Sequence, residues 1–134
     1  MSKSNLIRVT AAILEKDGKT LIAKRKTGDK LFAGLWEFPG GKVEEGETPE
    51  ECMARELKEE LEIEVEVVEF ITSNKHKYPH GYFELIAYRV KYISGEIVLN
   101  DHDDFKWVTI DEMDSFEFPP ADIPIIKKLT DNGI

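Results

Sequence analysis

The sequence predicts an α+β fold in which helices pack on a mixed, largely antiparallel sheet. Its 134 residues are 41% hydrophobic, enough for one buried core, and no repeat, low-complexity tract or linker divides them. Apolar segments rich in β-branched residues recur with turn signals between them, and other segments have helical spacing. We therefore expect one domain over residues 1–134, with helices covering the sheet as in an α+β fold or an α/β/α sandwich.

The first two strands are expected at 6–15 and 19–25, where apolar and β-branched residues predominate. Between them lies Asp17-Gly18, a dipeptide typical of a two-residue hairpin turn. The loop that follows contains an apolar segment, so we expect a further short strand at 35–38.

The clearest helix begins after Thr48. This residue can cap the helix, Pro49 suits the first helical position, and Glu51 lies where a capping box needs an acidic side chain. The apolar residues that recur at four-residue spacing are Met53, Leu57 and Leu61. This stripe predicts that one face of the helix is buried.

The remaining elements complete the sheet and add a second helical layer. Strands are expected at 64–71, 82–92, 96–99 and 105–109. A helical turn is expected at 111–115 and a closing helix at 121–129.

Composition and charge exclude several functional classes. The net charge of −9 argues against binding a nucleic-acid polymer through its phosphates. No apolar run approaches the length of a membrane span, and residues 1–5 lack the apolar stretch of a secretory signal. Cys52 is the one cysteine, so an intrachain disulfide is excluded and a reducing, cytoplasmic location is expected.

The negative charge is concentrated in one segment. Residues 44–69 contain twelve glutamates against Arg55 and Lys58. Within it, Glu56, Glu59 and Glu60 share one helix face, where like charges repel one another. Clustered carboxylates suit hard cations such as Mg²⁺ or Mn²⁺, although an ordinary solvated helix face has the same composition.

The spacing around this helix resembles the Nudix box, the signature of a large hydrolase family. That signature is a glycine, five residues, a glutamate, seven residues, then Arg-Glu-apolar-x-Glu-Glu-x-Gly-apolar. The matching residues are Gly41, Glu47 and the segment Arg55-Glu56-Leu57-Lys58-Glu59-Glu60-Leu61-Glu62-Ile63. The one departure is Glu62 in place of glycine. It predicts either a left-handed cap, costing about 1–2 kcal/mol, or a helix that runs on for part of a turn.

The resemblance extends beyond the box to the MutT-like branch of the family. The matching segments are Leu35-Trp36-Glu37-Phe38-Pro39-Gly40-Gly41-Lys42-Val43-Glu44, Phe118-Pro119-Pro120-Ala121-Asp122 and Lys24-Arg25. The resemblance implies an α/β/α sandwich with a mixed sheet. It also implies hydrolysis of a nucleoside triphosphate to the monophosphate and pyrophosphate, with Mg²⁺, or alternatively Mn²⁺, as cofactor.

The resemblance assigns roles residue by residue. The implied metal ligands of the box are Gly40, Glu56, Glu59 and Glu60. The residues implied to support the box are Gly41, Glu47 and Arg55, with the last two paired across the loop. MutT-like relatives also place a glutamate six residues before a tryptophan, and counting back from Trp107 reaches Asp101.

Asp101 is thereby implied as a further catalytic and metal-binding carboxylate. Glu56 and an acid from such a distant loop are alternative candidates for the group that takes a proton from the attacking water. Residues 100–104 also read as an ordinary polar turn, and His102 is expected to be a surface residue of that turn.

The residues expected to bind substrate are Arg25, Phe38, Lys42, Tyr78 and Asp122. The two basic residues would hold phosphates, and the two aromatic residues would stack on a base, although strand aromatics are commonly core. Residues 121–124 resemble the CTP pyrophosphohydrolase branch. Asp122 would accept a hydrogen bond from the cytosine amino group, or alternatively cap the last helix.

The sequence thus predicts a Mg²⁺-dependent nucleoside triphosphate pyrophosphohydrolase with CTP, dCTP and modified dCTP as favoured substrates. An oxidised dGTP is the alternative substrate, as for 8-oxo-dGTP diphosphatases of the MutT type. A non-catalytic Nudix-fold module that binds a nucleotide is the alternative of another class. Either a monomer or a homodimer is compatible with the sequence.

Overall fold

The structure is a computed structural model that describes residues 6–28 and 32–131. The expectation about residues 1–5, and part of the loop expected after the second strand, lie outside the described residues. The elements, in chain order, are β1 (Leu6–Lys16), β2 (Lys19–Arg25), β3 (Trp36–Glu37), α1 (Pro49–Leu61), β4 (Glu64–Tyr78), β5 (Gly81–Ser94), β6 (His102–Val108), η1 (Asp111–Ser115), η2 (Pro120–Asp122) and α2 (Ile123–Asp131). The two η elements are short 3₁₀ helices.

The sheet has the strand order β3-β2-β1-β5-β4, and β6 also pairs with β2, from Thr20 to Arg25. Its central pair, β1 with β5, is parallel and runs from Leu6 opposite Tyr82 to Glu15 opposite Lys91. The other pairs are antiparallel. The predicted mixed, largely antiparallel sheet is therefore confirmed.

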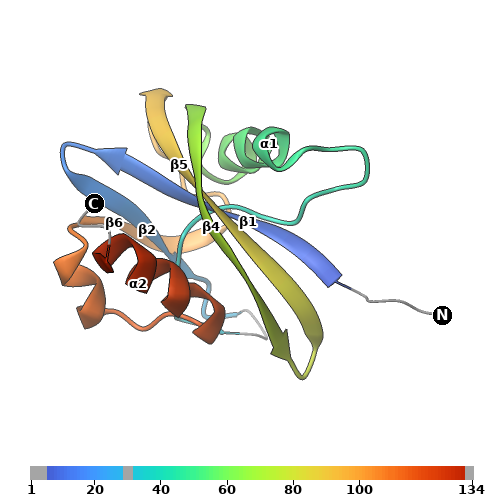
Figure 1. Cartoon of the computed structure of the whole chain (residues 1–134). Helices are drawn as coiled ribbons and strands as arrows, with labels where there is room; N and C mark the ends of the chain where they lie inside the picture. The colour runs from blue at the N-terminus through green and yellow to red at the C-terminus, as the bar shows by residue number, and fades with distance from the viewer. Residues whose placement is uncertain (1–5, 29–31, 132–134) are drawn as a thin grey trace.

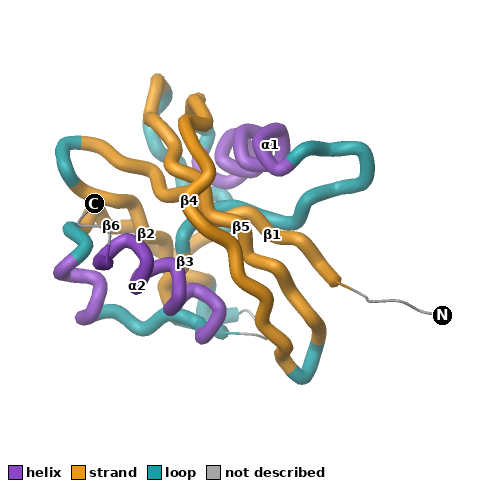
Figure 2. Tube along the Cα trace, viewed as in Figure 1, coloured by secondary structure: helices purple, strands orange, loops and turns teal. Residues whose placement is uncertain are grey.

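Helices cover both faces of the sheet. Figure 1 shows α1 on one side and α2 on the other, and Figure 2 shows the strands between them. Along β1 the side chains alternate, with Ala12 and Leu14 packing toward α1 while Ala11 and Ile13 pack toward α2. The central strands are thus buried on both faces, which is the arrangement of an α/β/α sandwich.

Helix α1 begins and packs as the sequence predicts. Thr48 Oγ1 accepts a hydrogen bond from the Glu51 N–H at 3.1 Å, and Glu51 Oε1 accepts one from the Thr48 N–H at 3.0 Å. The buried side chains of the helix are Cys52, Met53, Leu57 and Leu61. The Tyr88 hydroxyl on β5 donates to Glu50 at 3.1 Å, which fixes the first turn against the sheet.

The strand predicted at 96–99 is absent from the described sheet. This segment runs alongside the carboxyl end of α1, where the Val98 N–H donates to Leu61 O at 3.0 Å. Ile97 and Leu99 alternate as in a strand, but they pack on the α1 side of the core. The alternation of apolar residues in this segment therefore results from burial against α1 and not from pairing with another strand.

Among the other boundaries that differ from the prediction, three follow from contacts or turns in the structure. β4 continues past the predicted end at residue 71 as far as Tyr78, because its polar second half pairs with β5. β6 begins at His102 and not at 105, because it pairs with the end of β2. α2 begins at Ile123, after a 3₁₀ turn that contains Asp122. No helix in the described parts of the chain is long and apolar enough to cross a membrane.

The capping box gives a test of how α1 is held. We expect Thr48→Ala to lower the free energy of unfolding by about 1 kcal/mol, because the Glu51 N–H loses its acceptor. Urea unfolding followed by circular dichroism measures the change. Thr48→Ser keeps the hydroxyl and serves as the matched control, so an equal loss in both variants would contradict the role of the cap.

Candidate active site

Two adjacent glycines bring the loop before α1 against strand β1. The Ala12 N–H donates to Pro39 O at 2.7 Å, and the Thr10 N–H donates to Gly41 O at 2.8 Å. A Cβ on Gly40 would collide with the Thr10 carbonyl, and a Cβ on Gly41 would lie within 2.6 Å of all three atoms of the Glu56 carboxylate. Only glycines allow the loop to lie between β1 and the Glu56 carboxylate.

Arg55 connects that loop to the helix. Its Nε and Nη2 donate to the two oxygens of Glu47 at 2.6 and 3.0 Å, and Nη2 also donates to Lys42 O at 3.3 Å. Its Nη1 donates to Glu56 at 3.1 Å and to Glu59 at 3.2 Å. One guanidinium thus holds three glutamates and one carbonyl of the box in a fixed arrangement.

The Arg55 contacts shift the pKa values of both members of the pair. The hydrogen bonds from Arg55 lower the pKa of Glu47 to about 2, and the Glu44 N–H donates to the same carboxylate. Its bonds to Glu47 raise the pKa of Arg55 further above its usual value. The pair is therefore ionised at neutral pH.

Around Glu60 lies a group of carboxylates that we name the carboxylate cluster: Glu37, Glu56, Glu60 and Asp101. Burial, a hydrogen bond with Glu56, and the charges of Glu56, Glu37 and Asp101 raise the pKa of Glu60 well above its usual range. Glu60 Oε1 is enclosed and has no hydrogen-bond partner among the described residues. Glu59 is more exposed and faces Arg55.

The carboxylate cluster fits a hard divalent cation in its donor chemistry. Carboxylate oxygens are the preferred ligands of Mg²⁺ and Mn²⁺, and the enclosed Glu60 oxygen lacks the partner that a buried polar atom requires. Within the described ranges, no three His, Cys, Asp or Glu side chains are already arranged around a single metal position. Glu56 already contacts Glu60, whereas the Glu59 carboxylate contacts Arg55.

Asp101 is exposed to solvent, whereas the adjacent His102 is buried. Asp101 is exposed at the start of β6, near enough for its charge to raise the pKa of Glu60. His102 is not the surface residue that was predicted, since its side chain is 2% exposed and its Nε2 lies 2.8 Å from Glu37 Oε2. The alternating direction of side chains along β6 turns His102 inward.

A cavity of about 230 Å³ adjoins the carboxylate cluster, and we name it the Asp122 cavity. Its lining residues are Val9, Arg25, Phe32, Glu37, Tyr78, His80, Phe83, Leu85, Pro119, Ala121 and Asp122. Three predicted substrate residues, Arg25, Tyr78 and Asp122, therefore converge here from β2, β4 and η2. The cavity is mostly apolar with few polar groups, as is typical of a small-molecule site.

Asp122 is the most deeply buried acid in the Asp122 cavity. Burial and the nearby charge of Glu37 raise its pKa well above the usual range, while Arg25 acts in the opposite direction. Its Oδ2 is enclosed without a hydrogen-bond partner among the described residues, so this oxygen does not cap α2. Burial therefore favours the neutral form of this carboxyl group, which can both donate and accept a hydrogen bond.

The aromatic residues of the Asp122 cavity are only partly those expected. Tyr78 stacks on His80 at a centroid distance of 5.2 Å and contacts Phe32 at 5.0 Å, and its hydroxyl accepts from the Ala121 N–H at 2.8 Å. Phe38, expected to stack on a base, is 4% exposed and packs on Phe118 in the core. Phe32 and His80 carry no motif that could have identified them in the sequence.

Glu37 joins the carboxylate cluster to the Asp122 cavity. Its Oε1 accepts from Arg25 Nη1 at 2.8 Å and its Oε2 faces His102, while its charge raises the pKa of both Glu60 and Asp122. Sequence reasoning missed Glu37 as a site residue. The available signal was its place in the matched segment before the two glycines, on a strand whose other residue, Trp36, is buried.

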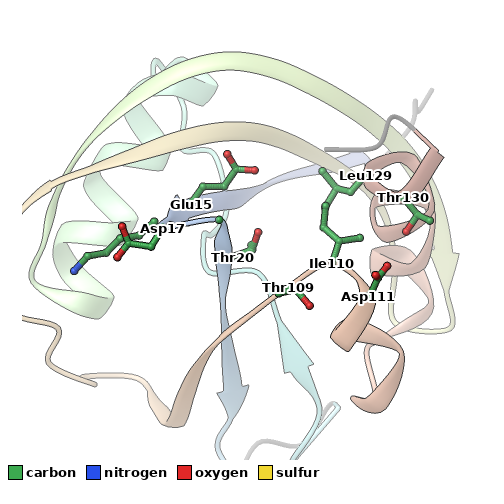
Figure 3. A pocket seen from close by; sticks show the side chains of 10 residues that line it. Glu15, Asp17, Thr20, Thr109, Ile110, Asp111, Leu129 and Thr130 are labelled. Carbon is green, nitrogen blue, oxygen red and sulfur yellow. The ribbon is translucent and has the colours of Figure 1, made fainter.

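Two further features lie apart from this site. Lys42, predicted to hold phosphates, lines a different cavity with Arg8 and residues 43–47, although its carbonyl accepts from Arg55. A larger cavity of about 660 Å³ lies between the β1–β2 turn and α2. Figure 3 shows Asp17 and Asp111 on opposite sides of that cavity, so its acids do not converge on one point.

Known proteins resemble this chain over nearly its whole length. It is 38% identical over 122 residues to CTP pyrophosphohydrolase of Escherichia coli K12, covering 91% of this chain and 90% of the relative. It is 29% identical over 123 residues to 8-oxo-dGTP diphosphatase of the same strain, covering 92% and 95%.

Solved structures agree with the fold. The solution structure of the E. coli ORF135 protein has a TM-score of 0.85 at 37% identity, covering 95% of this chain and 90% of that one. The crystal structure of a MutT protein from Methanosarcina mazei Go1 has a TM-score of 0.88 at 21% identity, covering 99% of each chain. Residues 5–129 match the NUDIX domain model, and the chain therefore belongs to the Nudix family of hydrolases.

The Arg55–Glu47 pair predicts a specific acid sensitivity. Glu47 has a pKa of about 2 in the folded state against an ordinary 4.5. Its lowered pKa contributes stability above pH about 4.5, and this contribution is lost as the pH falls from there to about 2. We expect Glu47→Gln to flatten the pH dependence of the free energy of unfolding in this interval. Glu45→Gln, an exposed glutamate of the same loop, should leave it unchanged.

Proposed function

We propose that the protein is a Mg²⁺-dependent nucleoside triphosphate pyrophosphohydrolase whose favoured substrates are CTP, dCTP and modified dCTP. The observation that carries the proposal is the junction at Glu37, which lies near Glu60 and also lines the cavity that contains Asp122. The Oε1 atom of Glu60 is enclosed there without a hydrogen-bond partner among the described residues. Such a site offers a place for a cation and the phosphates beside a place for a base. Its family membership supplies the hydrolytic reaction class.

The residues near the expected phosphate position have different roles, namely metal binding, positioning of the metal ligands and phosphate binding. Glu56, Glu59 and Glu60, with the Gly40 carbonyl, would hold Mg²⁺, which neutralises phosphate charge and favours deprotonation of the attacking water. Arg55, which is fixed by its bond to Glu47, holds Glu56 and Glu59 near that position. Arg25 lies between the carboxylate cluster and the Asp122 cavity, where a guanidinium can bind a phosphate oxygen.

Two carboxylates can take the proton from water. Glu56 lies against Gly41 and is held by Arg55, so it is fixed in position. Asp101 is exposed and lies near Glu60 at the start of β6. Water reaches Asp101 directly, which makes it the more accessible of the two candidates for the base.

The Asp122 side chain has the hydrogen-bonding groups needed to recognise the nucleobase of the substrate. A neutral carboxyl group can donate to the N3 of cytosine through one oxygen and accept from the N4 amino group through the other. The chain's 38% identity to a protein named CTP pyrophosphohydrolase supports this choice of base. The guanine ring offers an N–H donor beside a carbonyl acceptor, so oxidised dGTP is the rival substrate, as the 8-oxo-dGTP diphosphatase relative suggests.

A panel of nucleotides tests the proposal. We expect release of monophosphate and pyrophosphate from CTP, dCTP and 5-substituted dCTP with a higher kcat/KM than from 8-oxo-dGTP or the other common triphosphates. The reaction should stop with EDTA and resume with Mg²⁺. A preference for 8-oxo-dGTP over every cytidine nucleotide would overturn the assignment of cytosine as the nucleobase but not the assignment of the reaction.

Glu60→Gln separates an enzyme from a nucleotide-binding module. The variant keeps the shape of the side chain but replaces a carboxyl group that can ionise to bind a cation with an amide that cannot. We therefore expect a fall in metal affinity of at least 10–100-fold, with a matching loss of Mg²⁺-dependent turnover. Glu66→Gln, on β4 outside the site, is the matched control. If the wild-type protein has no Mg²⁺-dependent turnover for this change to remove, the non-catalytic alternative stands.

Two substitutions of Asp122 test whether its carboxyl group recognises the nucleobase in the neutral form. Asp122→Leu removes both hydrogen bonds and should lower kcat/KM for the best nucleotide by about 10–100-fold. Asp122→Asn also has a donor and an acceptor, so it should retain more activity on that nucleotide than Asp122→Leu does. Equal loss in both variants would contradict a neutral carboxyl group as the recognising group.

A further inference from the structure

Glu62 stands where the Nudix box has glycine, and it adopts the left-handed conformation that glycine would have. Its φ is 59° and its ψ is 38°, and its N–H donates to Lys58 O at 3.0 Å. This confirms the left-handed cap, one of the two predicted outcomes, and excludes a helix that runs on. A non-glycine residue in this conformation is strained by about 1 kcal/mol or more. The strain suggests that the Glu62 side chain makes an interaction that glycine could not make.

The Glu62 side chain binds Asn100. Asn100 Nδ2 donates to Glu62 Oε2 and to Glu59 O, each at 2.9 Å, and the Asn100 N–H donates to Glu60 O at 3.0 Å. The Val98 N–H donates to Leu61 O at 3.0 Å. The carbonyls that lack partners at the end of a helix are thus used to bind residues 98–100.

Gly95 belongs to the same arrangement. Its φ is 104°, and a Cβ there would lie 2.8 Å from Glu62 O and 3.0 Å from Ile63 Cα. The turn after β5 can therefore pass close to the left-handed residue only because position 95 is glycine. Close approach on one side of Glu62 and hydrogen bonds on the other hold the loop on the end of α1.

The residue that follows Asn100 is Asp101, the candidate base. Because Asn100 is tied to Glu59, Glu60 and Glu62, the backbone that leads into Asp101 has a fixed position relative to the candidate metal ligands. Asp101 lies near enough to Glu60 for its charge to raise that residue's pKa. The hydrogen bonds of Asn100 therefore hold the backbone next to Asp101 in place.

We propose that Asn100 is a positioning residue and that Glu62 holds it, so that the two form a latch that sets the Asp101 loop for catalysis. We name the pair the Asn100 latch. This proposal rests on the proposed function, because that function assigns Asp101 its catalytic role. It explains why this chain keeps a strained glutamate at a glycine position of the box.

Glu62→Gly separates the latch from ordinary stabilisation. The change relieves the left-handed strain and removes the acceptor of Asn100 Nδ2. We expect the melting temperature to stay the same or to rise, while amide hydrogen exchange at Val98 and Asn100 accelerates about tenfold in the metal-free protein. We expect kcat to fall about tenfold, with little change in KM, because the base is displaced and substrate contacts remain.

Two controls isolate the cause. Asp17→Gly relieves the same kind of strain, since Asp17 has a φ of 53° in the β1–β2 turn far from the latch, and it should change neither exchange nor kcat. Glu62→Gln remains strained but retains an acceptor for Asn100, so it should keep most of kcat. Asn100→Asp puts a carboxylate against Glu62 and should reproduce the loss seen in Glu62→Gly.

Each outcome decides the proposal. Unchanged exchange at Val98 and Asn100 in Glu62→Gly would show that Glu62 does not hold the loop. Faster exchange with an unchanged kcat would show that the loop is held for stability alone, and either result overturns the latch. Exchange is measured without metal or substrate, so these results are distinct from the Glu60→Gln test, whose failure would overturn the proposed function.

Discussion

The bidentate bond between Arg55 and Glu47 is the interaction on which the site depends. It ties a loop of irregular backbone to a regular helix and leaves Nη1 of the same guanidinium to hold Glu56 and Glu59. Without it, adjacent carboxylates would repel one another and the loop would have no fixed distance from the helix. Because the pair lies at the edge of the carboxylate cluster, it orients these side chains while the enclosed Glu60 oxygen remains without a partner.

The bulk charge of the chain is misleading about what the site can bind. A net charge of −9 disfavours a polyanion, and the excess is concentrated in the segment that includes α1. Within the site, burial raises the pKa values of Glu60 and Asp122, and the charge of Glu37 adds to both shifts. The surface charge and the charge at the site are therefore different quantities, and only the second bears on a small phosphorylated ligand.

Sequence reasoning worked where the local chemistry and the tertiary structure agree. The capping box at Thr48, the buried stripe of α1 and the hairpin at Asp17 follow from short-range rules, and the structure has all three. It failed where a distant partner decides. Residues 96–99 alternate like a strand but face a helix, and His102 is turned inward by pairing with β2 toward Glu37. Neither partner is visible in the nearby sequence.

The parallel pairing of β1 with β5 has a consequence for how the protein is made. The central pair joins Leu6 to Tyr82 and Glu15 to Lys91, so the middle of the sheet joins segments far apart in the chain. Closing so long a loop is slow compared with forming a helix or a hairpin. During synthesis, α1 leaves the ribosome before the β5 strand on which it packs. The apolar stripe of the helix therefore remains partly uncovered until most of the chain has been translated.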